Sequence, residues 1–445
     1  MPRRRSERRT RSGSRRIRAM SSMKNERRFM RGANALLPGR GFETQLLHAP
    51  QQAVIAFLSA VPLRPLGAEE VDIDDASGRF LAGDITARED VPLVARSTMD
   101  GFAIASAQTP GTFRVVGVAR ISKPWPERLV TGEALQVPTG GVIPHGGDCV
   151  VPIEDSNAKD GTITVDRALL PRDCIAAAGE DIAAGTLVLP AGRRVGAPEI
   201  SVLATLGYAR VPVFQQPLFG VLSGGDELIE VRESVTPGKV RDSNRYAVAA
   251  ALRAMGARVR HFPIVRDDER ECARALRDAL EQCDALAMSG GSSVGQLDFT
   301  PRAIASLGSP GVVVHGLRVK PGKPTVLGGA GGKPVLGLPG NPASALMILL
   351  AVGAPIVAAL TGARRRESEV AFPLGAPVDK RAGWTWFLPV TLQEADGRCV
   401  AMPLPMRSSW SSLLARSAGF IVLGEDIEHV DAGTEVGVRF FREAY

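Results

Sequence analysis

The chain has 445 residues, 44% of them hydrophobic and 23% charged, which is long enough for about two to four soluble domains with separate cores. Aromatic residues make up only 5%, which argues against base stacking as the main binding mode. Five scattered cysteines and five scattered histidines, without a CxxC pair, exclude a disulfide framework and a zinc cluster and favour a reducing, cytoplasmic compartment.

The net charge of +7 comes from the first residues. Residues 1–31 carry twelve Arg and one Lys against two Glu, a local +11, and subtracting this from +7 leaves −4 for the rest. Residues 1–40 have no apolar period and no apolar centre of a secretory signal, so we expect a disordered Arg-rich arm. Three interpretations stay open: an arm that binds nucleic acid or a membrane surface, a targeting peptide, or translation that starts at Met20, Met23 or Met30.

The next part of the chain predicts a domain split by an insertion. Helical spacing of apolar residues predicts an opening helix over 44–60, and a second helix is expected from Pro198 to about Leu206. Between them, residues 88–172 contain strand-like segments separated by Gly, Pro and Asp turns. We therefore expect a β domain at 88–172 inserted into a second domain, which is formed by 41–87 and 173–216.

From residue 217 strands alternate with helices of 10–16 residues, the pattern of βαβ units. This predicts an α/β domain at 217–363 with a mostly parallel sheet and helices on both faces. The apolar run at 345–360 is predicted to be a buried helix, because it is short for a membrane span and contains Pro355. Short strands return at 364–445, where we expect a small, barrel-like C-terminal β domain. The fold class is therefore α/β plus β, multidomain.

Three glycine-rich turns end strands of the α/β domain: SGGDE (223–227), SGGSSVGQLD (289–298) and GLPGNP (337–342). In an open α/β sheet, ligands bind at the carboxyl ends of strands. Glycine allows close approach of the backbone, and successive N–H groups form an anion-binding nest. An ordinary structural turn explains any one of them, but three together favour a ligand site.

Charged residues follow these turns. Asp226, Glu227 and Asp298 are candidates for Mg²⁺, which takes one or two protein carboxylates and completes its shell with ligand oxygens and water. For Asp226 the alternative is a turn or cap residue, and Asp242 is interpreted as a helix cap on local grounds. In LRVKPGKPT (317–325), two lysines flank a Pro-Gly turn and would neutralise a phosphate, unless the segment is only a surface turn.

Taken together, these segments resemble the molybdopterin molybdenumtransferase family, to which the C-terminal part of gephyrin belongs. The resemblance runs from about residue 44 to 442, and its motifs occur in family order: STMDGFA, PTGGVIPHGGDCVV, GEDI with LPAG, SGGDEL, RDSN, SGGSSVGQLDFT, VKPGKPT and GLPGNPASAL. The resemblance implies four domains, with the split domain at 41–87 and 173–216 as a linker and dimerisation domain, and a homodimer whose cleft is lined by both subunits. It also implies a Mg²⁺-dependent reaction of adenylylated molybdopterin with molybdate that releases AMP and leaves molybdenum on the dithiolene sulfurs.

The resemblance implies a functional role for each residue that matches a functional position of the family motifs. It implies catalytic roles for Asp100, Thr139, Asp181, Glu227 and Asp298, with Asp226 beside Glu227 and Asp298 as metal candidates. The implied substrate-binding residues lie in the glycine-rich and basic turns: Ser289, Gly290, Gly291, Ser292, Ser293, Gly295, Lys320, Lys323, Pro339, Gly340, Asn341 and Pro342.

The sequence departs from the family pattern at three places: Gly224 stands where Thr is common, Ser292 where Val or Thr is common, and Trp410 where a flexible glycine is usual. Ser411 and Ser412 are therefore not assigned as ligands, and a paralogue that favours tungstate stays open. Two other functions are weighed: the adenylyltransferase one step earlier, which lacks the flanking domains, and a non-catalytic scaffold. Expected partners are a second copy of the chain and the adenylyltransferase, without membrane, and nucleic acid only through the arm.

Overall fold

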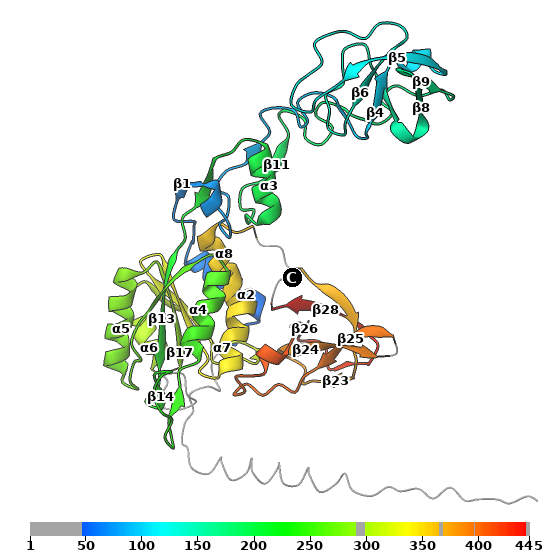
Figure 1. Cartoon of the computed structure of the whole chain (residues 1–445). Coiled ribbons are helices and arrows are strands. Elements are labelled where there is room, and N and C mark those ends of the chain that lie inside the picture. The colour runs from blue at the N-terminus through cyan, green and yellow to red at the C-terminus, as the bar shows by residue number, and fades with distance from the viewer. Residues whose placement is uncertain (1–46, 291–298, 365–367, 396, 442–445) are drawn as a thin grey trace, which may run out of the picture.

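The computed structural model describes residues 47–290, 299–364, 368–395 and 397–441. Figure 1 shows an elongated arrangement, with one six-stranded β sheet at the far end and two further sheets side by side at the other. All five cysteines are free thiols, in agreement with the absence of a disulfide framework expected from the sequence.

The two ends of the predicted insertion come together. Strand β1 (Ala68–Asp72) pairs antiparallel with β12 (Arg210–Phe214), and β2 (Ile85–Thr86) pairs with β11 (Leu187–Leu189) beside helix α3 (Ala197–Thr205). Helix α2 (Pro50–Ala60) packs elsewhere: its Ala53 and Phe57 are fully buried in the core of the α/β sheet. Packing therefore divides the segment 41–87, and the domain boundaries themselves stay predictions.

Residues between these pairs form the sheet at the far end of Figure 1, in the order β7-β4-β6-β5-β9-β8. The predicted strands of this region are confirmed. Their bounds are β5 (Gly111–Val118), β6 (Glu133–Val137), β7 (Cys149–Pro152) and β9 (Thr162–Val165). Two strands that were not predicted, β4 (Gly101–Ile104) and β8 (Asn157–Lys159), complete the sheet. The short pair β3 (Arg96–Ser97) and β10 (Ile175–Ala176) leads into this sheet.

The α/β region contains a six-stranded sheet in the order β16-β13-β17-β21-β20-β18. Only β20 runs against the other five strands, so the sheet is mixed but mostly parallel. Its central strands are buried on both faces, as parallel strands are. The bounds are β13 (Leu218–Gly224), β16 (Arg258–His261), β17 (Ala285–Gly290), β18 (Pro310–His315), β20 (Val326–Ala330) and β21 (Lys333–Leu338).

Helices cover both faces of this sheet, as predicted. One core contains residues of α5 (Glu269–Gln282) and α6 (Thr300–Ala305), and the other contains residues of α2, α4 (Asn244–Ala254), α7 (Pro342–Ile348) and α8 (Ala354–Thr361). A π-helical turn at Leu349–Gly353 joins α7 to α8 and places Pro355 at the start of α8. The stretch Pro342–Thr361 is long and apolar enough to span a membrane, but 67% of its most apolar window is buried inside the protein, as in a core helix.

The C-terminal sheet has the order β19-β24-β26-β28-β22. Strand β25 pairs with residues Val390–Ala395 of β24. The bounds are β19 (Val319–Lys320), β22 (Val370–Pro373), β24 (Thr385–Ala395), β25 (Arg398–Pro403), β26 (Gly419–Leu423) and β28 (Glu435–Phe440). A single bridge from Leu374 to Ala401 joins the two edges of the sheet. The barrel-like form stays a prediction. Strand β19 of this sheet lies in the sequence between β18 and β20 of the α/β region, so main-chain hydrogen bonds join the two regions.

Candidate functional site

A cleft of about 780 Å³ opens at the carboxyl ends of β13, β17 and β21. It brings together segments that are far apart in the chain. They are the ends of β13 and β17, the short pair β14 (Leu228–Ile229) and β15 (Val240–Arg241), the basic turn at 319–324, the turn at 339–344, and parts of 406–411 from the C-terminal region. The position is the one expected for a ligand site in an open α/β sheet.

Glycine is required where the first two turns meet. Gly224 and Gly290 are paired in register between β13 and β17. Gly290 has φ +88°, and a Cβ on it would collide with the carbonyl oxygen of Gly224. Only glycine takes this conformation without strain and lets the two backbones approach so closely. The second glycine turn therefore begins as a tight main-chain surface at the bottom of the cleft.

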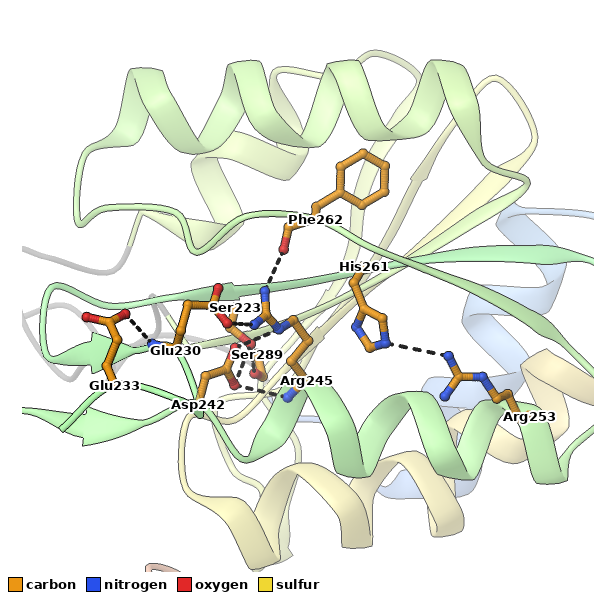
Figure 2. Close-up of polar contacts among 9 residues, drawn as sticks. All are labelled: Ser223, Glu230, Glu233, Asp242, Arg245, Arg253, His261, Phe262 and Ser289. Atoms are coloured by element: carbon orange, nitrogen blue, oxygen red, sulfur yellow. Dashed lines mark hydrogen bonds and ion pairs between the residues drawn. The ribbon is translucent and has the colours of Figure 1, made fainter. Parts of the chain in front are cut away.

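A buried polar network, whose side chains Figure 2 shows, includes Ser223 and Ser289, the residues that precede these two glycines. Asp242 is 2% exposed, and its Oδ1 accepts hydrogen bonds from Ser223 Oγ and from the backbone N–H of Arg245, both at 3.0 Å. The hydroxyls of Ser223 and Ser289 lie 3.3 Å apart. This network connects the ends of two strands to the first turn of α4 and thereby positions the base of the cleft.

Arg245 supplies the positive charge of the network. It is 6% exposed, forms an ion pair with Glu230, donates to the carbonyl oxygen of Phe262 at 3.1 Å, and has its Nε 3.4 Å from Asp242 Oδ2. Burial alone would lower the pKa of Arg245, but the hydrogen bond to Glu230 and the charge of Asp242 raise it overall. The guanidinium therefore stays charged beneath the cleft and compensates the buried carboxylate.

The rim of the cleft carries exposed charges. Glu227, Lys320 and Lys323 line the cavity and are exposed. Side-chain amides hold the neighbouring turn: Asn244 Nδ2 donates to the carbonyl oxygen of Gly340 at 2.7 Å, and Asn341 Nδ2 lies 3.2 Å from Ser408 Oγ. The rim thus combines two ammonium groups with one carboxylate, and its loops are joined to α4 and to the C-terminal region.

Most of the residues predicted in the turns are brought together here. The cavity is lined by Glu227, Ser289, Gly290, Lys320, Lys323, Pro339, Gly340, Asn341 and Pro342. Five predicted residues lie outside the described part of the chain: Gly291, Ser292, Ser293, Gly295 and Asp298. Asp226 does not line the cavity. Its Oδ1 accepts instead from the backbone N–H of Asp267 at 3.3 Å, as expected for a turn residue.

Two of the remaining candidates form a pair beside the ends of β4 and β6 of the inserted sheet. Asp100 Oδ1 accepts from the backbone N–H of Thr139 at 2.6 Å and from its hydroxyl at 3.0 Å. The backbone and then the side-chain hydrogen bond from Thr139 hold the pKa of Asp100 below its usual value. Both residues and Asp181 are exposed. They belong to the part of the chain that Figure 1 places away from the α/β sheet, and none of them lines the cleft.

Sequence reasoning missed several cleft residues. Asp242 caps the start of α4, as predicted, because its Oδ1 accepts from the backbone of Arg245, but it also lines the cavity. Asp242 directly follows β15, and its return to the glycine-rich turn at 223–227 depends on the pairing of β14 with β15, which local pattern does not show. Asn244 and the three serines at 408, 409 and 411 also line the cleft. Asn244 is the last residue of the RDSN motif, which could have indicated it.

Comparisons with known proteins agree with this geometry. Family models match three regions of the chain: the "MoeA N-terminal region (domain I and II)" at 48–207, the "Probable molybdopterin binding domain" at 220–359, and the "MoeA C-terminal region (domain IV)" at 371–441.

Individual relatives cover most of the chain. The molybdopterin molybdenumtransferase of Haemophilus influenzae is 34% identical over 71% of this chain and 78% of its own length, and that of Bacillus subtilis is 32% identical over 84% and 90%. A solved molybdopterin biosynthesis MoeA protein from Pyrococcus horikosii superposes with a TM-score of 0.72 at 30% identity, over 90% of this chain and all of that one. The chain therefore belongs to the molybdopterin molybdenumtransferase family, a family of transferases in molybdenum cofactor biosynthesis.

Proposed function

We propose that the protein inserts molybdenum from molybdate into the dithiolene of adenylylated molybdopterin and releases AMP. The observation that carries this proposal is the cleft itself, in which Lys320, Lys323 and Glu227 meet the glycine main chain at Gly290. Both substrates are anionic, and the cleft offers ammonium groups and backbone N–H groups at strand ends, which bind phosphate and oxyanions.

The groups of this chain act by binding and orientation. The two lysines neutralise phosphate or oxyanion charge at the rim, and the serine-lined base offers hydroxyl donors and acceptors. Holding two reactants in one cavity of about 780 Å³ converts a bimolecular step into an effectively unimolecular one. No side chain has to form a covalent intermediate.

The cleft fits Mg²⁺ as a cofactor. The part of the chain that the structure describes contains no group of three or more His, Cys, Asp or Glu placed to hold a metal, whereas Mg²⁺ needs only one or two carboxylates and takes substrate oxygens and water for the rest. Glu227 would hold it, with Asp298 as the second proposed carboxylate. When bound, Mg²⁺ would neutralise charge on the phosphoanhydride.

We further propose that the protein acts as a homodimer. Asp100, Thr139 and Asp181 lie outside the cleft of their own chain, so they contribute to it only if a second copy brings them there. Contact with the molybdopterin adenylyltransferase, which supplies the adenylylated substrate, is part of this proposal. The reaction is placed in the cytoplasm, where the five free thiols stay reduced.

Turnover tests the reaction. Purified protein is incubated with adenylylated molybdopterin and molybdate, with or without Mg²⁺, and AMP release is measured. We expect release that needs both molybdate and Mg²⁺, with tungstate as a parallel substrate. Adenylylation of free molybdopterin by ATP would instead identify the protein as an adenylyltransferase. If neither assay shows a reaction, the remaining function is that of a non-catalytic scaffold.

Neighbouring carboxylates provide a matched pair of variants. Glu227→Gln removes a carboxylate that lines the cleft, and Asp226→Asn changes the adjacent one that contacts Asp267. We expect Glu227→Gln to lower AMP release by about 100-fold, the scale of removing one electrostatic group, with Asp226→Asn close to wild type. Asp298→Asn should resemble Glu227→Gln. Equal effects at 226 and 227 would contradict the assignment.

Mixing two inactive variants tests the shared site. In a heterodimer of Asp100→Asn and Glu227→Gln subunits, a site built from both chains has one intact copy and one doubly altered copy. Random exchange between two-fold symmetric dimers should then restore about a quarter of wild-type turnover. A mixture no more active than its parts would contradict a site shared between subunits.

A further inference from the structure

One charged residue of the rim is in contact with the C-terminal sheet. Lys320 is the last residue of β19, and its Nζ lies 4.1 Å from the centre of the Trp386 indole ring. This is well within the distance of about 6 Å at which a cation is attracted to an aromatic face, and Trp is the strongest partner. In the part of the chain that the structure describes, Lys320 forms no ion pair with a carboxylate.

Main-chain pairing sets this contact. Strand β19 pairs in parallel with β24, which places Val319 opposite Thr385 and Lys320 opposite Trp386. The backbone N–H of Thr385 also donates to the carbonyl oxygen of Arg318 at 2.9 Å. Lys320, at the start of the basic turn, is therefore fixed to a residue 66 positions later in the sequence.

The indole ring itself is fixed by packing. Trp386 is half-buried and packs against the core of the C-terminal sheet, between the buried residues Thr385 and Phe387. On the other side of the basic turn, Gly322 has φ +109°, and a Cβ on it would collide with Ile348 of α7. The flexible Lys320 side chain therefore has a rigid turn at its backbone end and a rigid ring at its ammonium end.

We propose that Trp386 is a positioning residue of the cleft, which holds the Lys320 ammonium at the rim while leaving its charge and its N–H donors available to an anion. The physical reason is that an aromatic face has no lone-pair acceptor and no net charge, whereas a carboxylate partner would neutralise the ammonium. Lysine otherwise has high rotamer entropy, and fixing it before binding lowers the entropic penalty of anion binding. The inference rests on the proposed function only in that the cleft binds an oxyanion or a phosphate.

A double-mutant cycle on the full-length protein tests the coupling. The variants are Trp386→Leu, Trp386→Phe, Lys320→Gln and the double variant Trp386→Leu/Lys320→Gln. Titration calorimetry measures binding of molybdate and, separately, of AMP, at constant ionic strength. Trp384→Leu is the matched control, because Trp384 is a second tryptophan two residues away, whereas the Lys320 ammonium lies over the ring of Trp386.

Trp386→Leu should weaken anion binding by about 2- to 5-fold, the scale of an exposed cation–π contact, and Trp386→Phe should recover part of it. In the Lys320→Gln background the same substitution should have no further effect. Coupling seen with molybdate would identify the oxyanion as the ligand of Lys320, and coupling seen with AMP would identify the nucleotide phosphate as its ligand. Equal weakening in both backgrounds, or coupling with neither anion, would overturn the proposal. Any general loss of stability appears in both backgrounds and cancels.

A second measurement needs neither ligand nor activity. Reductive ¹³C-methylation keeps the lysine charge, and a methyl group above an indole ring shows an upfield-shifted NMR signal. We expect one such signal that is absent in Lys320→Arg and shifts back in Trp386→Leu. A Lys320 signal at the ordinary position in the wild type would sink the proposal. Loss of turnover with this signal intact would contradict the proposed function but not the role of Trp386.

Discussion

Two carboxylates make the same hydrogen bonds in opposite surroundings. Asp242 Oδ1 accepts from one hydroxyl, Ser223, and one backbone N–H, and Asp100 Oδ1 does the same with Thr139. Asp242 is 2% exposed beside a buried arginine, whereas Asp100 is exposed. Because a buried charge depends on its partners far more than a solvated one does, equal geometry predicts unequal energies.

The largest effect is expected for Asp242→Ala. Removing this carboxylate leaves the buried Arg245 with Glu230 as its remaining carboxylate partner. We expect the free energy of unfolding to fall by about 3 kcal/mol, the low end for breaking a buried ion pair. Urea denaturation measures it. Asp242→Asn keeps the shape and should lose less, and a loss as small as that of Asp100→Ala would break the comparison.

The next effect concerns the main chain that covers the buried network. Gly290→Ala places a Cβ against Gly224 at a positive φ, so we expect a loss of more than about 1 kcal/mol. Gly340→Ala is the control, because its Cβ would meet only the Cα of Gly290 at 3.5 Å, an ordinary contact. Thermal unfolding of both variants should separate them clearly, and similar melting temperatures would contradict the close approach.

Removing the hydroxyl that donates to each carboxylate, Ser223 for Asp242 and Thr139 for Asp100, sharpens the comparison. Ser223→Ala leaves a buried carboxylate oxygen and the Ser289 hydroxyl each without one partner, which should destabilise by about 1–3 kcal/mol. Thr139→Val removes the matching hydroxyl at an exposed site, where we expect a change within about 0.5 kcal/mol. Both are measured by denaturant unfolding. Equal losses would show that burial does not decide the energy.

The smallest effect is a pH dependence at Asp100. Its pKa is lowered in the folded state by the backbone and side-chain hydrogen bonds of Thr139, so the stability it contributes is present above the unfolded pKa and is lost as pH falls through the folded value. Carboxyl NMR titration should find the pKa below that of an unfolded Asp. Thr139→Val should raise it part of the way, because the backbone bond remains. An unchanged pKa in the variant would exclude the hydroxyl as a cause.

Much of the fold could be predicted, because apolar residues recur along the sequence with the period of a helix or a strand. Strands β13 and β17 end at the glycine-rich turns, as predicted, and the C-terminal strands follow the predicted pattern. The short pair β14 and β15 and the six-residue helix α6 were not predicted, because elements of this length have no clear period. The packing of helix α2 in the core of the α/β sheet could not be predicted, because amphipathic spacing does not say which surface a helix covers.

The sequence by itself determined which residue types stand at strand ends: glycine turns, a lysine pair and single carboxylates in family order. Only the tertiary structure decided how they are used. It turned Asp226 toward Asp267 while its neighbour Glu227 lines the cleft, buried Asp242 against Arg245, and paired Lys320 with Trp386. The physical reason is that composition and periodicity are local properties, whereas burial, register and charge pairing depend on segments that meet only after the chain has folded.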